Sequence, residues 1–153
     1  AAQILDADAF DVERLISEAQ SDIDAELATD VLIIEDEAII SADIQSLVTE
    51  LGHRVTGTAT THDEAIDAVA RHKPGLVLAD IQLADGSSGI DAVNDILKVD
   101  TIPVIFITAF PERLLTGERP EPAFLVTKPF NPDMVKALIS QALFFNERVA
   151  EQV

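Results

Sequence analysis

Residues 31–40 read VLIIEDEAII, and this stretch decides how the rest of the chain is interpreted. Four consecutive apolar residues suit a short strand that is buried on both faces of a sheet. Two acids, Glu35 and Asp36, follow at once, with Glu37 behind them. Neighbouring carboxylates repel each other unless water or a cation separates them. The stretch therefore predicts either solvated acids or one half of a cation site at the end of a buried strand.

Apolar runs and amphipathic segments continue to alternate along the chain. Further strands are predicted at 54–59, 76–79, 104–107 and 124–127. Helices are predicted near 40–51, 61–73, 90–97, 111–117 and 132–143. Gly52 is placed to end the first helix, a capping box at Thr61–Glu64 to open the second, and Asn131 to cap the last before Pro132. This repeat predicts an α/β fold, a doubly wound, five-stranded parallel sheet with helices on both faces.

The composition excludes several classes of protein. The chain has 153 residues, enough for one domain with a core, and no cysteine, which excludes a disulfide scaffold, a thiolate metal site and a cysteine nucleophile. The net charge of −18, from 28 acids against 10 bases, disfavours nucleic acid and acidic membranes as partners. No apolar run approaches the roughly 20 residues that cross a bilayer and no signal peptide is visible, so we expect a cytoplasmic protein.

The first 30 residues differ from the rest, because they hold nine acids and a single base, Arg14. Residues 9–28 predict an amphipathic helix, with apolar residues at spacings of three and four. A helix of this length cannot bury its apolar stripe alone. The chain also begins with alanine, which is typical of a piece of a longer protein. We expect an acidic helical segment at 1–29, a domain at 30–149 and a tail at 150–153.

Reactive or charged residues follow the strongest strands. Asp80 comes after the strand at 76–79, Thr108 after 104–107 and Lys128 after 124–127. In a parallel sheet the carboxyl ends of the strands meet at one edge, where ligands bind. We therefore expect Asp80 to lie beside Glu35 and Asp36. Three carboxylates with added water are typical of Mg²⁺ sites that also bind phosphate oxygens.

These residues suggest phosphoryl transfer. Asp80 can attack phosphorus to give an aspartyl phosphate, while the metal neutralises charge on the transferred group. Lys128 would supply a second cation and Thr108 a hydroxyl donor. Singly, each has an ordinary explanation as a solvated loop acid, a helix cap, a turn residue or a surface lysine, so the interpretation depends on the whole set. A cis peptide at Lys128-Pro129 would aim the lysine.

At this point the chain resembles the receiver domains of two-component response regulators. The matching motifs are VLIIEDE at 31–37, LVLAD at 76–80, PVIFITA at 103–109 and KPF at 128–130. The resemblance implies the strand order 2-1-3-4-5, with Asp80 as the phosphoacceptor. It also implies Glu35, Asp36 and the main-chain carbonyl of Gln82 as metal ligands, Thr108 as the switch hydroxyl and Lys128 as the phosphate-binding lysine. The phosphodonor would be a histidine kinase or a phosphotransfer protein. Such a domain is not an enzyme, although it takes part in its own phosphorylation and dephosphorylation.

Two departures from the family's usual pattern favour a narrower resemblance. Leu125 stands where family members carry an aromatic residue, and the loop DIQLADG at 80–86 lacks the common Met-Pro pair. Together with FITAFPER at 106–113, these features resemble the PhyR-type regulators of the general stress response. In that type a sigma-factor-like domain precedes the receiver, and phosphorylation frees it to bind an anti-sigma factor. Residues 9–28 resemble the last helix of that domain, which implies a contact between this helix and the receiver.

Other functions stay open at this point. A pseudo-receiver, which would act as a constitutive interaction domain without phosphorylation, shares the fold. A regulator with a DNA-binding effector is weakened by the lack of a basic helix after residue 130. A phosphatase with an aspartate nucleophile would need a cap or a substrate pocket, for which the chain has little room. The three histidines, His53, His62 and His72, are expected to be solvated.

Overall fold

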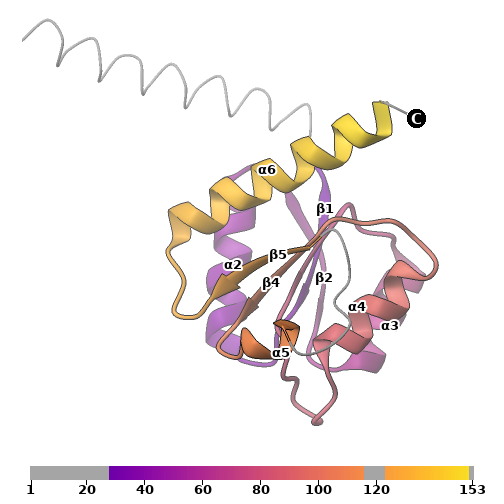
Figure 1. Ribbon diagram of the computed structural model, residues 1–153, viewed down its shortest axis with the longest axis vertical. Helices are drawn as coiled ribbons and strands as arrows, with labels where there is room; N and C mark the ends of the chain where they lie inside the picture. The colour runs from indigo at the N-terminus through magenta and orange to yellow at the C-terminus, as the bar shows by residue number, and fades with distance from the viewer. Residues whose placement is uncertain (1–27, 116–122, 152–153) are drawn as a thin grey trace, which may run out of the picture.

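A parallel sheet forms the centre of the protein, as the sequence predicts. The computed structural model describes residues 28–115 and 123–151, and its sheet has five strands in the order β2-β1-β3-β4-β5 (Figure 1). All four strand pairs are parallel. The strands are β1 (Asp30–Ile34), β2 (Arg54–Ala59), β3 (Leu76–Ala79), β4 (Val104–Thr108) and β5 (Ala123–Thr127).

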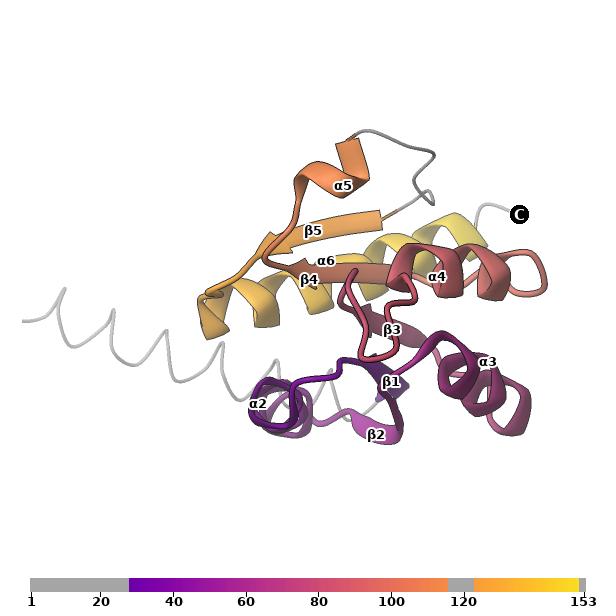
Figure 2. The same cartoon turned by 90° about the horizontal axis from the view of Figure 1, so that it is seen from below.

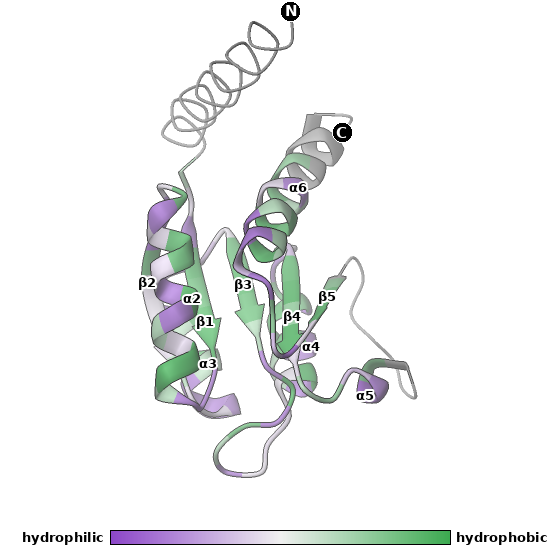
Figure 3. Cartoon of the chain, turned by 90° about the vertical axis from the view of Figure 1, so that its left-hand side faces the viewer, coloured by the Kyte–Doolittle hydropathy of each residue, from purple (hydrophilic) through white to green (hydrophobic). Residues whose placement is uncertain are grey.

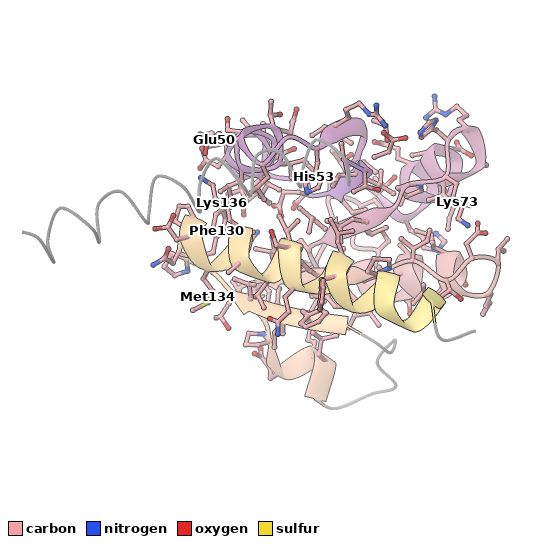
Figure 4. All side chains as sticks on the ribbon, turned by 90° about the horizontal axis from the view of Figure 1, so that it is seen from above. Glu50, His53, Lys73, Phe130, Met134 and Lys136 are labelled. Carbon is pink, nitrogen blue, oxygen red and sulfur yellow. The ribbon has the colours of Figure 1, made fainter. Side chains whose placement is uncertain are left out.

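Helices cover both faces of the sheet (Figure 2). They are α2 (Ala38–Glu50), α3 (His62–Arg71), α4 (Gly89–Leu97), α5 (Glu112–Leu115) and α6 (Pro132–Glu151). Helices α2 and α6 contact each other on one face, and α3 and α4 contact each other on the opposite face. An ion pair of 2.7 Å between Lys136 of α6 and Glu50 of α2 joins the first pair at the surface (Figure 4).

The two faces of the central strands bury separate halves of the core. Ile33 and Ile105 lie in the cluster packed under α2 and α6, whereas Leu32 and Phe106 lie in the cluster under α3 and α4. Leu114 of α5 joins the second cluster. Because β1, β3 and β4 are buried on both faces, they read as continuous apolar runs, and they form the green centre of Figure 3.

Local sequence signals set the helix boundaries. Gly52 has a φ of 93°, the left-handed conformation expected after a helix. The hydroxyl of Thr61 accepts a hydrogen bond from the Glu64 N–H at 3.2 Å. The Glu64 carboxylate accepts from the N–H of Thr60 at 3.1 Å, so only half of the predicted capping box forms. The Asn131 side chain caps α6 by accepting from the Asp133 N–H at 2.9 Å.

Some boundaries differ from the prediction. Helix α3 ends at Arg71, earlier than the expected end beside Pro74, because His72 adopts an extended backbone with a φ of −156°. Helix α6 runs to Glu151, past the predicted apolar stripe that ends at Leu143. The helix predicted at 9–28 and its contact with the domain lie outside the described residues, apart from residue 28. None of the described helices has both the length and the hydrophobicity needed to span a bilayer.

The prediction of solvated histidines is wrong for His53. Its side chain is buried, and its Nδ1 accepts a hydrogen bond from the Thr29 N–H at 3.2 Å. His72 is exposed but lies 2.5 Å from the carboxylate of Asp30, which Arg54 also contacts at 2.8 Å. Hydrogen bonds from His72 and then Arg54 hold the pKa of Asp30 below its usual range. These contacts fasten the start of β1.

Candidate functional site

The ends of four strands bring the predicted site residues together. Backbone hydrogen bonds continue the sheet one residue past the strands: the Asp80 N–H donates to the Ile34 carbonyl at 2.8 Å, and the Lys128 N–H donates to the Thr108 carbonyl at 2.8 Å. The Glu35 N–H likewise donates to the main chain at the end of β2. These bonds fix the backbones of the site residues in the frame of the sheet.

Three carboxylates converge at this edge. One oxygen from each of Glu35, Asp36 and Asp80 lies within 4.8 Å of the other two. Glu35 and Asp80 are buried, with 3% and 7% of their surface exposed, while Asp36 is half-buried. A cluster of hard oxygen donors open on one side fits Mg²⁺, which prefers carboxylates and retained waters. The predicted grouping of these acids is confirmed, and their role as ligands stays a prediction.

Gln82, whose carbonyl is the fourth predicted ligand, lies in the loop after β3. Its side chain is exposed, and its backbone forms an isolated antiparallel bridge with Ser88. The bridge fixes the main chain on which the carbonyl sits. Its part in metal binding stays a prediction.

The ammonium of Lys128 lies between two of the carboxylates. Its Nζ is 3.1 and 3.0 Å from the oxygens of Glu35 and 3.0 Å from Oδ2 of Asp80. The Lys128 side chain is only 11% exposed, so these ion pairs are shielded from water. The peptide bond between Lys128 and Pro129 is cis, the form that the sequence analysis considered for this dipeptide. These distances place the ammonium of Lys128 beside Asp80, the residue predicted to accept the phosphoryl group.

The charges of the site are unevenly balanced. Burial raises the pKa of Glu35 to about 7, against the lowering effect of Lys128, and the charge of Asp80 raises it further. For Lys128 burial lowers the pKa, but hydrogen bonds with Asp80 and Glu35 outweigh it and the net shift is upward. One ammonium thus faces more negative charge than it can compensate. A divalent cation at the three carboxylates would relieve this imbalance.

Asp80 and Thr108 also accept hydrogen bonds from the main chain. Oδ1 of Asp80 accepts from the Ile81 N–H at 2.6 Å, which leaves Oδ2 for Lys128. Thr108 is fully buried, and its hydroxyl accepts from the Phe110 N–H at 3.0 Å. Sequence reasoning missed both donors, because a backbone N–H carries no residue-specific signal.

Leu125 lies on β5 beside Phe106 of β4 and is 37% exposed. Its aliphatic side chain has no polar atom that could form a hydrogen bond with the hydroxyl of Thr108. Phe110, which does bond Thr108 through its backbone, is 41% exposed. The hydroxyl of Thr108 is therefore bonded to the main chain after β4 and not to the side chain of Leu125.

Two surface grooves lie between neighbouring elements of the described fold. One, of about 780 Å³, lies between α2 and the loop after β5 and includes Ala109, Lys128 and Phe130. The other, of about 900 Å³, lies between α3 and α4 and includes His62 and Asp95. Of these two grooves, only the first is lined by a predicted site residue, Lys128.

Comparison with known proteins supports the same reading. The model of the response regulator receiver domain family matches residues 31–140. The chain is 60% identical over 148 residues to the phyllosphere-induced regulator PhyR of Methylorubrum extorquens. The matched region covers 96% of this chain and 55% of that protein. It thus spans about half the length of that relative.

Two solved structures show how the similarity is distributed. The solution structure of the Erythrobacter litoralis PhyR receiver domain is 67% identical, has a TM-score of 0.74 and covers 77% of this chain and 92% of that one. The Bartonella quintana anti-anti-sigma factor PhyR, in complex with the anti-sigma factor NepR, is 68% identical with a TM-score of 0.60, covering 90% of this chain and 57% of that one. The match to an isolated domain covers nearly all of that domain.

Proposed function

The chain belongs to the response regulator receiver family and is a receiver domain of the PhyR type, and we propose that it is switched by phosphorylation of Asp80. One observation supports this most directly: the Asp80 carboxylate lies 3.0 Å from the ammonium of Lys128 and within 4.8 Å of two further carboxylates. A nucleophile, a phosphate-binding cation and a set of metal ligands are thus within reach of one phosphoryl group.

The proposed reaction is a phosphoryl transfer in line with the attacking oxygen. A carboxylate oxygen of Asp80 forms a bond to phosphorus, while the bond from phosphorus to a histidine nitrogen of the donor breaks. The electron pair of that bond stays on the imidazole. Lys128 pairs with the oxygens of the transferred group, and the Thr108 hydroxyl donates to one of them. The chain acts as a phosphoacceptor and, as we propose, not as an enzyme on another substrate.

Receiver domains generally bind Mg²⁺ at the acidic site, and we propose Glu35, Asp36, Asp80 and the Gln82 carbonyl as the ligands here. When bound, the ion neutralises charge on the transferred phosphoryl group. The carboxylates supply the hard oxygen donors that this ion prefers. Glu35 would then exchange part of its contact with Lys128 for the metal, which frees the ammonium for phosphate oxygens.

The phosphodonor is proposed to be a histidine kinase or a phosphotransfer protein. Asp80 is only 7% exposed, so the donor must bring its phosphohistidine to the mouth of the site. The groove of about 780 Å³ beside Ala109 and Lys128 gives a macromolecule room to approach there. Its walls combine apolar residues of α2 and the β5–α6 loop, such as Ile40 and Phe130, with acids at the rim.

The proposed output is control of an anti-sigma factor in the general stress response. A PhyR of Bartonella quintana forms a complex with the anti-sigma factor NepR, and this chain spans 55% of its curated PhyR relative. We propose that a sigma-like domain of the longer protein binds the anti-sigma factor, that residues 9–28 contact the receiver, and that phosphorylation of Asp80 releases this contact.

Intact-mass spectrometry with acetyl phosphate and Mg²⁺ tests the phosphorylation. The wild-type protein should gain one phosphoryl group, about 80 Da from its atoms, as the oxygen of Asp80 replaces acetate on phosphorus. Asp80→Asn and a chelator should each abolish the gain. Asp85→Asn, an exposed acid in the same loop, should leave it intact. A wild-type protein that gains no mass, or an Asp80→Asn variant that still gains it, would favour the pseudo-receiver.

A further inference from the structure

The first residue of α4, Gly89, lies directly against the backbone of Asp80, because the loop between them turns back on itself. The Gly89 N–H donates to the carbonyl of Ile81 at 2.7 Å. The antiparallel bridge between Gln82 and Ser88 closes the loop at the same place. The loop therefore begins and ends beside the proposed phosphoacceptor.

Position 89 has no room for a side chain. A Cβ on Gly89 would lie 1.7 Å from the carbonyl oxygen of Asp80 and 2.8 Å from its carbonyl carbon. Both are main-chain atoms, so no side-chain rotation can relieve the overlap. The other glycine of this loop, Gly86, has a φ of 82° and nothing within 4 Å of its Cβ position. Gly86 is thus required for its backbone conformation, whereas Gly89 is required for its size.

The overlap matters because the Asp80 backbone sets where its carboxylate lies. The Asp80 N–H is tied to the Ile34 carbonyl at 2.8 Å, so pressure on the Asp80 carbonyl tilts the residue rather than moving it along the sheet. A tilt changes both carboxylate contacts, the 2.6 Å bond from the Ile81 N–H and the 3.0 Å contact with Lys128. The acceptor oxygen and a proposed metal ligand would be displaced together.

We propose that Gly89 is a positioning residue of the phosphorylation site. It touches neither the carboxylate oxygens nor the incoming phosphoryl group, and it acts by letting the start of α4 lie against the Asp80 carbonyl. The inference rests on the proposed phosphorylation of Asp80. A misplacement on the order of 1 Å at a reacting group lowers a rate by up to about 100-fold, and the 1.7 Å separation forces a displacement of at least that size.

The test is the rate of phosphorylation of Gly89→Ala by acetyl phosphate with Mg²⁺, followed by intact mass. We expect the maximal rate to fall roughly 10- to 100-fold. The acetyl phosphate concentration that gives half of that rate should change little, because donor contacts are unaltered. Alanine is a better helix former than glycine, so α4 is not weakened by the substitution. Circular dichroism and thermal unfolding report whether the variant is folded.

Gly57→Ala is the matched control. A Cβ at Gly57 of β2 would lie 3.2 Å from Cδ1 of Leu32, so this substitution presses on the core away from the site. Whatever its effect on the unfolding temperature, it should leave the rate per folded molecule unchanged. A wild-type maximal rate in Gly89→Ala would overturn the inference. Absence of phosphorylation in the wild-type protein would instead overturn the proposed function.

The wild-type protein supplies a second measurement that does not depend on the folding of a variant. If Gly89 is held against the Asp80 backbone, its amide, which donates to the Ile81 carbonyl at 2.7 Å, should exchange with deuterium far more slowly than an unprotected loop amide. Exchange of the Gly89 amide at the rate of an unprotected loop amide would show that the contact is not held, and the inference would fail.

Discussion

The ammonium of Lys128 lies 3.1 and 3.0 Å from the two carboxylate oxygens of Glu35, a residue 93 positions earlier in the chain. Their side chains are only 11% and 1% exposed. Two charges so far from water have each lost most of their hydration, and they compensate one another. Removing Lys128 leaves the Glu35 carboxylate buried without its counter-ion, whereas Lys128 also has a second partner in Asp80.

We therefore expect Lys128→Met to lower the free energy of unfolding by roughly 3 kcal/mol at pH 7 without Mg²⁺. Burial raises the pKa of Glu35 to about 7, and protonation of this carboxylate limits the loss of stability. Urea unfolding measures it. The control is Lys73→Met, which breaks an exposed pair with Asp100 and should lower the free energy by under about 1 kcal/mol. Equal losses in the two variants would contradict the buried pairing.

Mg²⁺ should raise the unfolding temperature of the wild-type protein, because a ligand that binds only the folded state stabilises it. At a concentration 100 times the dissociation constant the gain is about 2.7 kcal/mol. Asp36→Asn removes one charge from the cluster of three carboxylates and should weaken the response. Asp43→Asn, on the exposed surface of α2, should respond as the wild type does. A Mg²⁺ response in Asp36→Asn equal to that of the wild type would remove Asp36 from the ligand set. Thermal unfolding across a Mg²⁺ titration provides the data.

Thr108→Val replaces a buried hydroxyl with a methyl group of similar size. The Phe110 N–H then loses the acceptor that it has at 3.0 Å, and we expect a loss of about 1 kcal/mol in the free energy of unfolding. The amide of Phe110 should exchange faster with deuterium. Thr127→Val changes the neighbouring, exposed threonine of β5 and should not affect that amide. Unchanged exchange at Phe110 in Thr108→Val would show that the hydroxyl does not hold this segment.

His62 should make stability depend on pH. Its Nε2 lies 2.7 Å from Asp95, and this hydrogen bond raises the pKa of His62, with a smaller contribution from Asp63. The same bond lowers the pKa of Asp95. A raised histidine pKa gives stability that is complete below the unfolded-state value of about 6.5 and is lost as the pH rises through the folded-state value.

The wild-type protein should therefore exceed His62→Gln in stability by more at pH 5.5 than at pH 8.5, both values lying above the range in which Asp95 gains a proton. Urea unfolding of both proteins at the two pH values gives the comparison. A difference that is the same at both pH values, or larger at pH 8.5, would show that the charge of His62 does not contribute.

The strands and the positions of the candidate site residues could be predicted from the order of residues along the chain. In a parallel sheet the residues that follow each strand all lie at the same edge. β3 (Leu76–Ala79) is buried on both faces, so its apolar run marks its own bounds, and the next residue, Asp80, must lie at the carboxyl edge. β2 (Arg54–Ala59) alternates between exposed and less exposed residues because it is an edge strand, and it gave a weaker but still readable pattern.

The contacts between distant residues could not be predicted in the same way. Nothing near His53 in the sequence shows that it accepts a hydrogen bond from Thr29, 24 positions away. The choice of Glu35 as a partner of Lys128 depends on how two strand ends meet. Position 89 requires glycine because the main-chain carbonyl of Asp80 leaves no room for a Cβ. Every residue has such a carbonyl, so the sequence gives no sign of this contact. A single sequence therefore predicts which residues follow each strand, but not which distant residues come into contact.

The ion-paired group of Asp30, His72 and Arg54 shows how far a change at Asp80 lies from the start of β1. It lies at the amino end of β1, whose five residues put roughly 16 Å between it and the carboxylate cluster at the other end. Two unit charges at that separation interact by only about 1 kcal/mol at an effective dielectric constant of about 20. A new charge on Asp80 would therefore have little direct effect on the ion pairs of Asp30. We expect any effect of phosphorylation at this end of β1 to come from movement of the helices packed on the sheet.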